Sequence, residues 1–334
     1  MNDTVLNLAA QRYGTTAKAL TAMPGGHVTH VYEFAREDKR FVLRVTPPND
    51  EIDVPAMEAI LAWMYHLSTN GVSVAGPLPS EQGKLVEQIE QEDGEYVVVA
   101  LEKAKGVLAE ELAAGQWTGE LYRSLGQTVG KMHALSMDYV APERTPGRPD
   151  WDQIGNCFNP VAVLDESQAT IAAKKADILR TIRTLPKDRD SYGLAHLDLH
   201  FGNFYVDVAS GTITLFDFDD CAYGWYMMDV AMPLFDVLVL CPDADKEAFA
   251  AHFLNHYLRG YIAAKDLSAF WLGQLPHFLK LVEIGVYTQV YRAYDPQDAD
   301  SWIGRFMAGR RERIENDVPY VNLKTKGLLQ AAGC

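Results

Sequence analysis

The sequence predicts an α+β protein with two lobes, a small β-rich N-terminal lobe and a larger, mainly helical C-terminal lobe. Within the first hundred residues, short β-forming segments surround one helical stretch. From about Lys105 onward, long helical patterns dominate, and one β-rich island, Phe204–Phe216, interrupts them. At 334 residues the chain is long enough for two lobes, and we expect them to span residues 1–103 and 104–334.

Strands in the N-terminal lobe are predicted where β-forming residues cluster between turn residues. The helix of this lobe is predicted where apolar residues recur at helical spacing, from Met57 to Leu67, and Gly71 is typical of its end. In chain order the segments are the strands Val31–Ala35 and Arg40–Val45, the helix Val54–Asn70, and the strands Leu85–Glu90 and Tyr96–Glu102.

Helices in the C-terminal lobe are predicted from apolar residues at helical spacing. The segments that show this pattern are Glu120–Ser136, Leu164–Leu185, Lys246–Ala264 and Leu267–Ala293. Three prolines within residues 142–149 predict a loop between the first two of these helices.

Composition narrows the classes of partner. The formal net charge is −15, from 45 acidic and 30 basic residues, so nucleic acid or an anionic membrane surface is repelled on average, whereas a cationic small molecule is tolerated or attracted. The N-terminus shows no signal-peptide pattern, and the longest apolar run, residues 230–240, is too short to span a bilayer. We therefore expect a cytoplasmic protein without nucleic-acid or membrane partners.

The β-rich island predicts a hairpin with chemistry at its open end. Strand-like residues flank a loop that ends at Gly211, where glycine can adopt the positive φ that this position needs. Asn203 and Asp217 each lie seven residues from Ser210, so we expect their Cβ atoms roughly 5 Å apart across the hairpin. An amide oxygen and a carboxylate so placed are suited to Mg²⁺.

A second carboxylate, that of Asp198, lies five residues before Asn203 on the loop that enters the hairpin. A carboxylate beside a metal ion, but not tied to it, can accept a hydroxyl proton from an attacking substrate. The sequence therefore predicts a catalytic base next to the metal site.

These residues form a signature, His196-x-Asp198-x-x-x-x-Asn203 followed by Asp217-Phe218-Asp219. It resembles the catalytic signature of the aminoglycoside phosphotransferase and choline kinase superfamily, over about residues 20–310. The resemblance implies a protein-kinase-like two-lobed fold and transfer of the γ-phosphoryl group of ATP to a hydroxyl of an aminoglycoside-, choline- or homoserine-like molecule. It also implies Asp198 as the catalytic base and Asn203 and Asp217 as ligands of Mg²⁺.

Residues around the signature are expected to support it. His196 and His200 are predicted to hold the loop by hydrogen bonds, and Asp219 completes the acidic end of the signature. By resemblance, Asp229 braces the catalytic loop from a helix. Leu197 departs from the family, which usually has glycine there, and the difference can alter loop packing without replacing a reacting group.

In the N-terminal lobe the resemblance implies the nucleotide contacts. Gly25-Gly26 would belong to a short loop over the phosphates, and Arg44 stands where protein kinases carry a phosphate-pairing lysine. A guanidinium can pair bidentately with phosphate oxygens, and Glu58 is the nearest acid of the next helix that can orient it. Glu102 and Ala104 would lie at the hinge, where backbone groups meet adenine.

Three other functions stay open on the sequence alone. A Ser/Thr protein kinase of the stress-response type shares the signature, although only eleven residues separate Asp217 from Asp229 and no Ala-Pro-Glu segment follows. A metal-dependent hydrolase would use a transition metal on His196, Asp198, His200 and Asp217. A kinase-shaped binding protein without activity would be expected to lack the base or a metal ligand, and all three are present.

Overall fold

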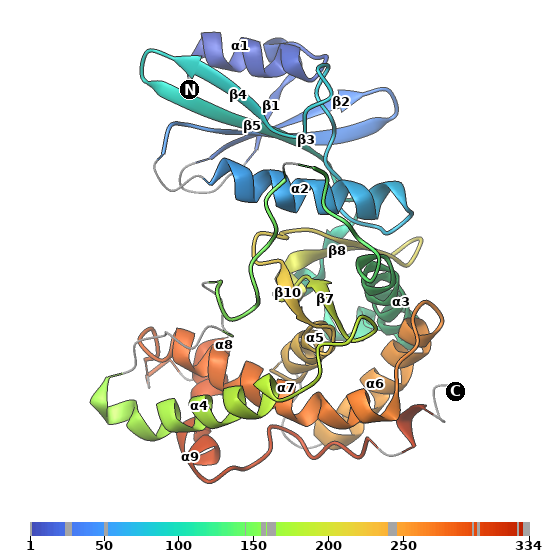
Figure 1. Cartoon of the computed structure of the whole chain (residues 1–334), viewed down its shortest axis with the longest axis vertical. Helices are drawn as coiled ribbons and strands as arrows, with labels where there is room; N and C mark the ends of the chain where they lie inside the picture. Colours follow the sequence, from blue (N-terminus) through green and yellow to red (C-terminus); the bar gives the residue numbers. More distant parts are fainter. Residues whose placement is uncertain are drawn as a thin grey trace. The chain divides into compact units, whose positions relative to one another are not determined.

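The computed structural model describes residues 2–23, 29–49, 53–143, 145–154, 158, 165–239, 246–295, 297–298, 301–325 and 327–329 (Figure 1). The chain divides into two compact units, the first of residues 1–106, 139–148 and 214–219, and the second of residues 107–138, 149–213 and 220–334. Gly25 and Gly26 lie outside the described residues. None of the described helices is long and apolar enough to cross a bilayer.

The first unit is built on an antiparallel sheet, which in the described residues has five strands in the order β1-β2-β3-β5-β4. The strands are β1 (Thr21–Met23), β2 (His30–Arg36), β3 (Lys39–Thr46), β4 (Glu87–Gln91) and β5 (Gly94–Glu102). The unit also has the helices α1 (Asp3–Arg12) and α2 (Val54–Thr69) and a 3₁₀ turn, Ala17–Ala19. The four strands and the helix predicted here are confirmed, whereas α1 and β1 were not predicted.

The two helices of this unit cover opposite faces of the sheet (Figure 1). Tyr13, which caps the C-terminal end of α1, is buried with Leu43 and Val98, and its hydroxyl donates to the Val98 carbonyl oxygen at 3.1 Å. Since successive strand side chains point to opposite faces, Arg44 and Val99 lie on the other face, where they line a cavity together with residues of α2. The alternation of β3 therefore places Arg44 on the α2 side.

The second unit is mainly helical, as predicted. Its helices are α3 (Gly119–Ser136), α4 (Ala169–Arg183), α5 (Met228–Val239), α6 (Lys246–Ile262), α7 (Ala269–Val290), α8 (Trp302–Met307) and α9 (Arg310–Glu315). It also contains the 3₁₀ turns Ala109–Glu111, Ala114–Gln116, Glu166–Gln168 and Phe201–Asn203. The strands β7 (Tyr192–Ala195) and β10 (Ala222–Trp225) pair antiparallel, and β6 (Val107–Leu108), β8 (Phe204–Asp207) and β9 (Thr212–Leu215) form a sheet in the order β6-β8-β9.

The predicted hairpin of the β-rich island is present as β8 and β9. Its turn is closed by a hydrogen bond from the Gly211 N–H to the Asp207 carbonyl oxygen at 2.8 Å, and Gly211 has a φ of +72°. Glycine adopts this conformation without the strain that a side chain would add, so the predicted role of Gly211 is confirmed. The strands are one residue shorter at their ends than predicted.

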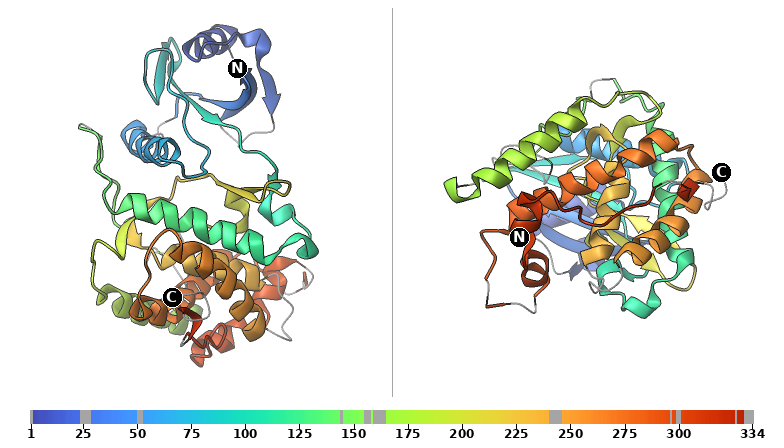
Figure 2. Two further views of the ribbon diagram at one scale, coloured as in Figure 1. Left: turned by 90° about the vertical axis from the view of Figure 1, so that its right-hand side faces the viewer. Right: turned by 90° about the horizontal axis from the view of Figure 1, so that it is seen from below.

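Helices α3 and α6 lie side by side (Figures 1 and 2). A Cβ atom on Gly126 would come within 1.9 Å of the Tyr257 carbonyl oxygen, and one on Gly260 within 1.9 Å of the Arg123 carbonyl oxygen. Both positions must be glycine for the two backbones to approach this closely. This contact fixes α3 and α6 as one layer of the unit.

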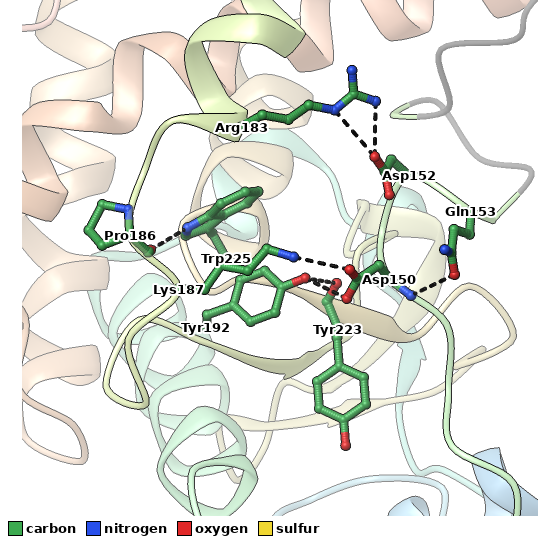
Figure 3. A network of polar contacts seen from close by, with 9 residues as sticks. All are labelled: Asp150, Asp152, Gln153, Arg183, Pro186, Lys187, Tyr192, Tyr223 and Trp225. Carbon is green, nitrogen blue, oxygen red and sulfur yellow. Dashed lines mark hydrogen bonds and ion pairs between the residues drawn. The ribbon is translucent and has the colours of Figure 1, made fainter.

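A polar network secures the start of β7, the strand that leads into the catalytic loop (Figure 3). The Asp150 carboxylate accepts hydrogen bonds from the Tyr192 hydroxyl at 2.7 Å and from Lys187 Nζ at 3.0 Å. The backbone beside it is bonded to β10, with the Trp151 N–H donating to the Tyr223 carbonyl oxygen at 2.8 Å. Residues 149–154 therefore act as a strap along the β7–β10 ribbon.

Helix α5 is not among the helices predicted from periodicity, because Pro233 and Asp236 interrupt its apolar run, although the resemblance implied a helix at Asp229. Proline has no N–H, so the carbonyl oxygen four residues earlier, that of Asp229, loses its helical donor. The Tyr257 hydroxyl of α6 donates to this oxygen at 3.1 Å, and Tyr257 is fully buried. A side chain from another helix thus replaces the missing backbone bond, and the helix continues through the proline.

We expect Tyr257→Phe to lower the free energy of unfolding by about 1–3 kcal/mol, because it leaves a buried carbonyl oxygen without a donor. Urea denaturation measures the difference. Tyr65→Phe, on a side chain that is 40% exposed, is the matched control and should change stability by less than about 0.5 kcal/mol. Equal losses in the two variants would contradict this role for the hydroxyl.

Candidate active site

The catalytic loop of the signature connects β7 to β8 and is held together by its own backbone. Hydrogen bonds run from the His200 N–H to the Asp198 carbonyl oxygen and from the Asn203 N–H to the His200 carbonyl oxygen, both at 2.9 Å. His196 is fully buried, and its Nδ1 accepts a long hydrogen bond of 3.4 Å from the Asp198 N–H. His196 is thus part of the loop's interior, as its predicted supporting role requires.

Asn203 is oriented by Asp198. Its side-chain Nδ2 donates to the carbonyl oxygen of Asp198 at 2.7 Å and to Oδ2 of the Asp198 carboxylate at 3.0 Å. Both bonds use the nitrogen of the amide, so Oδ1 is directed away from them and keeps its lone pairs. This is the orientation that a hard cation such as Mg²⁺ would need from an asparagine.

His200 keeps the Asp198 carboxylate charged. Its Nδ1 accepts a hydrogen bond from the Gly202 N–H at 3.0 Å, and its Nε2 lies 3.5 Å from Oδ2 of Asp198. Burial by itself raises the pKa of the Asp198 carboxyl, but the hydrogen bond and charge of His200 and the amide of Asn203 lower the pKa below its ordinary value. The carboxylate is therefore ionised and able to accept a proton at neutral pH.

Asp229 lies on α5 beneath the loop, where the resemblance implies a brace. Its carboxylate, fully buried, accepts hydrogen bonds from the backbone N–H groups of His196 at 2.8 Å and Leu197 at 2.7 Å. Consecutive N–H groups that point the same way form an anion-binding concavity, which arises where one residue adopts a left-handed conformation. Leu197 supplies it, with a φ of +64°.

The conformation of Leu197 explains why glycine is usual at its position in the family that the signature resembles. A non-glycine residue with this φ costs roughly 1–2 kcal/mol. The Leu197 side chain is fully buried, and its Cδ2 lies 3.0 Å from where a Cβ atom on Gly224 would be. The absent side chain at Gly224, on β10, makes the room that Leu197 fills, and this burial offsets the strain.

His133 was missed by the sequence analysis. It lies on the buried face of α3, its Nε2 is 2.9 Å from Oδ2 of Asp229, and its Nδ1 is 2.9 Å from the Tyr261 hydroxyl. Burial is the main cause that lowers the pKa of the His133 imidazole, which therefore stays neutral and donates from Nε2. The available signal was a histidine among the apolar positions of a predicted helix, which more often reports packing than function.

The Asp198 carboxylate opens into a cavity of about 810 Å³ in the second unit. Its acidic and basic lining residues are Glu110, Glu111, Asp198, His200, Asp220 and Asp236. Its apolar lining includes Phe201, Met232, Phe235, Val286 and Trp302. Among the described residues, no lysine or arginine lines it, so the cavity combines a negative wall with an apolar one.

The first unit contains Arg44, a predicted nucleotide contact, together with the predicted metal ligand Asp217 and the supporting residue Asp219. Arg44, Asp217 and Asp219 line a cavity of about 60 Å³ together with apolar residues of β5 and α2. Asp217 has a φ of +60°, and the following Phe218 is buried with its ring 5.4 Å from that of Trp63, edge to face. The cavity therefore pairs a cationic side chain and two carboxylates with an apolar wall.

Three further residues predicted in the N-terminal lobe are Glu58, Glu102 and Ala104. Glu58 is exposed on α2, and the described ion pairs do not join it to Arg44. Glu102 is the last residue of β5, its carboxylate pairs with Lys39 Nζ at 2.7 Å, and its N–H donates to the Gly76 carbonyl oxygen at 2.8 Å. Ala104 follows the end of β5 in irregular backbone, where its peptide groups are outside the strand ladder.

A family model and a kinase of known name match this chain. A family model described as phosphotransferase enzyme family matches residues 19–269. Amicoumacin kinase of Bacillus subtilis (strain 168) is 32% identical over 320 residues, which cover 95% of this chain and 93% of that protein.

Two solved structures of kinases are similar to this chain over nearly its full length. The amicoumacin kinase hAmiN, in complex with AMP-PNP, Ca²⁺ and Ami, matches with a TM-score of 0.82 and 29% identity over 98% of this chain and 97% of that chain. The microcompartment-associated aminopropanol kinase matches with a TM-score of 0.70 and 22% identity over 95% of this chain and 98% of that chain. At this lower identity, the match to the aminopropanol kinase shows a shared fold only.

We expect the free energy of unfolding to fall as the pH drops below about 6.5. Because burial holds the pKa of His133 below its ordinary value of 6.5, the unfolded chain takes up a proton in this range that the folded chain does not. Stability is then lost at up to about 1.4 kcal/mol per pH unit. The titratable side chains that face the imidazole are those of Asp229, Lys265 and His196.

Urea denaturation between pH 5.5 and 7.5 measures this slope. His133→Asn, which keeps a donor for Asp229, should make the slope shallower than that of the wild type. Met132→Ala, at a neighbouring buried position, should lower stability by about 2–5 kcal/mol through lost packing while keeping the wild-type slope. An unchanged slope in His133→Asn would show that another group titrates.

Proposed function

Because the chain belongs to the phosphotransferase enzyme family, we propose that it transfers the γ-phosphoryl group of ATP to a hydroxyl of a small molecule that also carries an amine. The chain is a kinase-like phosphotransferase that acts on small molecules. The observation that carries the choice of acceptor is the cavity at Asp198, whose described lining has five carboxylates and no lysine or arginine. A cationic group gains favourable interactions there, while an anionic acceptor is repelled.

The two other activities that the signature left open are excluded. The relatives over nearly the full chain are small-molecule kinases, so the protein-kinase alternative is wrong. The same relatives exclude the metal-dependent hydrolase alternative. His196, which that alternative needed as a ligand, is enclosed within the loop.

In the proposed reaction Asp198 acts as the base. Its ionised carboxylate accepts the proton of the acceptor hydroxyl as the oxygen attacks the γ-phosphorus, and the bond from that phosphorus to the bridging oxygen of ADP breaks. Asn203 holds the carboxylate in place through Nδ2, so little reorientation is needed when the acceptor arrives. His200 supports the ionised form of the base, as its predicted supporting role requires.

The proposed metal is Mg²⁺, with the amide oxygen of Asn203 and the carboxylate of Asp217 as its protein ligands. Both are hard oxygen donors, and the amide of Asn203 is turned so that its oxygen is unused by Asp198. When bound, Mg²⁺ offsets the negative charge of the phosphates. The relative solved with AMP-PNP and Ca²⁺ supports a nucleotide and a divalent cation here.

The nucleotide contacts in this proposal follow the sequence analysis. Arg44 would pair with phosphate oxygens, the Gly25-Gly26 segment would cover them, and backbone groups near Glu102 and Ala104 would meet adenine. Glu58 would act on Arg44 only through a change of conformation, since the two are not paired. Residues 1–103 would then bind the nucleotide and residues 104–334 would bind the acceptor and carry the base, in a cytoplasmic enzyme.

Relatives suggest which acceptors to test first. The names of two of them specify amicoumacin and aminopropanol, and the apolar wall formed by Phe235, Val286 and Trp302 favours the larger, less polar of such molecules. We therefore propose an acceptor of the amicoumacin or amino-alcohol type. Acceptor-dependent release of ADP, measured with a panel of amine-bearing and amine-free alcohols, tests this choice.

We expect Asp198→Asn to lower kcat by about 10²–10⁴-fold, because the amide cannot accept the hydroxyl proton. ADP release at saturating acceptor measures it. Asp177→Asn, an exposed carboxylate on α4, is the control and should retain wild-type turnover. Wild-type kcat in Asp198→Asn would contradict its assignment as base, and a wild type that releases no ADP with any alcohol would contradict the function itself.

Removal of divalent cations with EDTA should abolish turnover, and Mg²⁺ should restore it. Asp217→Asn should raise the Mg²⁺ concentration at half-maximal rate at least about tenfold, because a charged ligand is lost. Titration of the rate with Mg²⁺ measures this, with Asp177→Asn again as control. The same Mg²⁺ dependence in wild type and Asp217→Asn would remove Asp217 from the proposed ligand set.

A further inference from the structure

Helix α5 holds the catalytic loop at a second point that the signature does not contain. Asp236 lies seven residues after Asp229, which is about two helical turns, so both side chains leave the same face of the helix. Oδ2 of Asp236 accepts a hydrogen bond from the Phe201 backbone N–H at 2.7 Å. Asp229 holds the N–H groups of His196 and Leu197. The two carboxylates thus fix both ends of the loop that carries the base.

The carboxylate of Asp236 also faces the acceptor cavity. Its side chain lines the same space as Asp198 and His200, and no donor from the described part of the chain reaches its other oxygen, Oδ1. Burial raises the pKa of this carboxyl, the Phe201 N–H and His200 lower it, and the negative Glu110 and Asp198 raise it again, so that the pKa lies above its ordinary value. A cation at Oδ1 would stabilise the ionised form.

We propose that Asp236 is a positioning residue that joins acceptor binding to the catalytic loop. Oδ2 holds the loop through the Phe201 N–H, and Oδ1 binds the cationic group of the acceptor in the cavity. This inference rests on the proposed function. The anchored loop and the anchored amine share one carboxylate, so the acceptor hydroxyl is held at a fixed offset from the Asp198 carboxylate, and alcohols whose amine lies at another distance are poor substrates.

Two substitutions separate the two contacts. Asp236→Asn keeps an oxygen that can accept from the Phe201 N–H but removes the charge, whereas Asp236→Ala removes both. Hydrogen exchange of a peptide covering residues 197–203 should be unchanged in Asp236→Asn and faster in Asp236→Ala. Acceptor-free ATP hydrolysis, in which water replaces the alcohol, should be roughly tenfold slower in Asp236→Ala than in the wild type, because the loop that carries Asp198 loses an anchor.

Kinetics with amicoumacin and aminopropanol as acceptors test the cation contact. Asp236→Asn should raise the KM for the acceptor by about tenfold or more with little change in kcat, and Asp236→Ala should also lower kcat. Asp177→Asn and Asp177→Ala, at an exposed carboxylate of α4, control for loss of charge alone and should match wild type. If Asp236→Ala does not fold, Asp236→Asn still gives the KM result.

Three results would overturn the inference. Equal hydrogen exchange in wild type and Asp236→Ala would remove the loop contact. Unchanged KM in Asp236→Asn, or a preference of the wild type for amine-free alcohols, would remove the cation contact. Failure of the proposed function looks different, because the wild type would then release no ADP with any acceptor.

Discussion

The catalytic loop depends on one buried negative charge, that of Asp229. A carboxylate at this depth needs several donors, and it has the two loop N–H groups and the neutral imidazole of His133. In return the loop is held in a backbone conformation that its own sequence disfavours at Leu197. This arrangement sets the direction in which the side chain of the next residue, Asp198, leaves the loop.

The described lining of the cavity at Asp198 carries more acidic than basic side chains. Several carboxylates line one cavity, and burial raises the pKa of both Asp198 and Asp236. At Asp198 this tendency is overcome by His200 and Asn203, whereas at Asp236 it is not. Two aspartates in one cavity therefore differ in protonation behaviour because of their neighbours, and we propose only Asp198 as the base.

The sequence predicted what is encoded locally. The hairpin of β8 and β9 depends on Gly211 and on strand-forming residues beside it, and the long helices depend on their own periodicity, so both were readable. Helix α5 was not, because its continuation through Pro233 requires the hydroxyl of Tyr257, which comes from a different helix. His133 was missed for a similar reason, since its partner Asp229 is 96 residues away.

Within the site, the residues of the motif could be predicted from the sequence, whereas the residues that surround them could not. Asp198, Asn203 and Asp217 are identified by spacing. The proposed base, Asp198, is kept ionised by His200, and the proposed metal ligand, Asn203, donates to Asp198 through Nδ2. Asp236 and Glu110 carry no spacing signal and acquire meaning only through the cavity that they line. Glu58 was chosen by proximity in sequence, which does not specify the direction of a helix face.

Because Leu197 packs against Gly224, the residue types that positions 197 and 224 tolerate depend on each other. A Cβ atom at position 224 would lie 3.0 Å from Leu197 Cδ2, so a larger residue there crowds the leucine, and a smaller residue at 197 leaves a void while glycine occupies position 224. A substitution at either position alone should therefore lower the stability of the protein. Relatives with glycine at position 197 should therefore carry a bulkier residue at position 224.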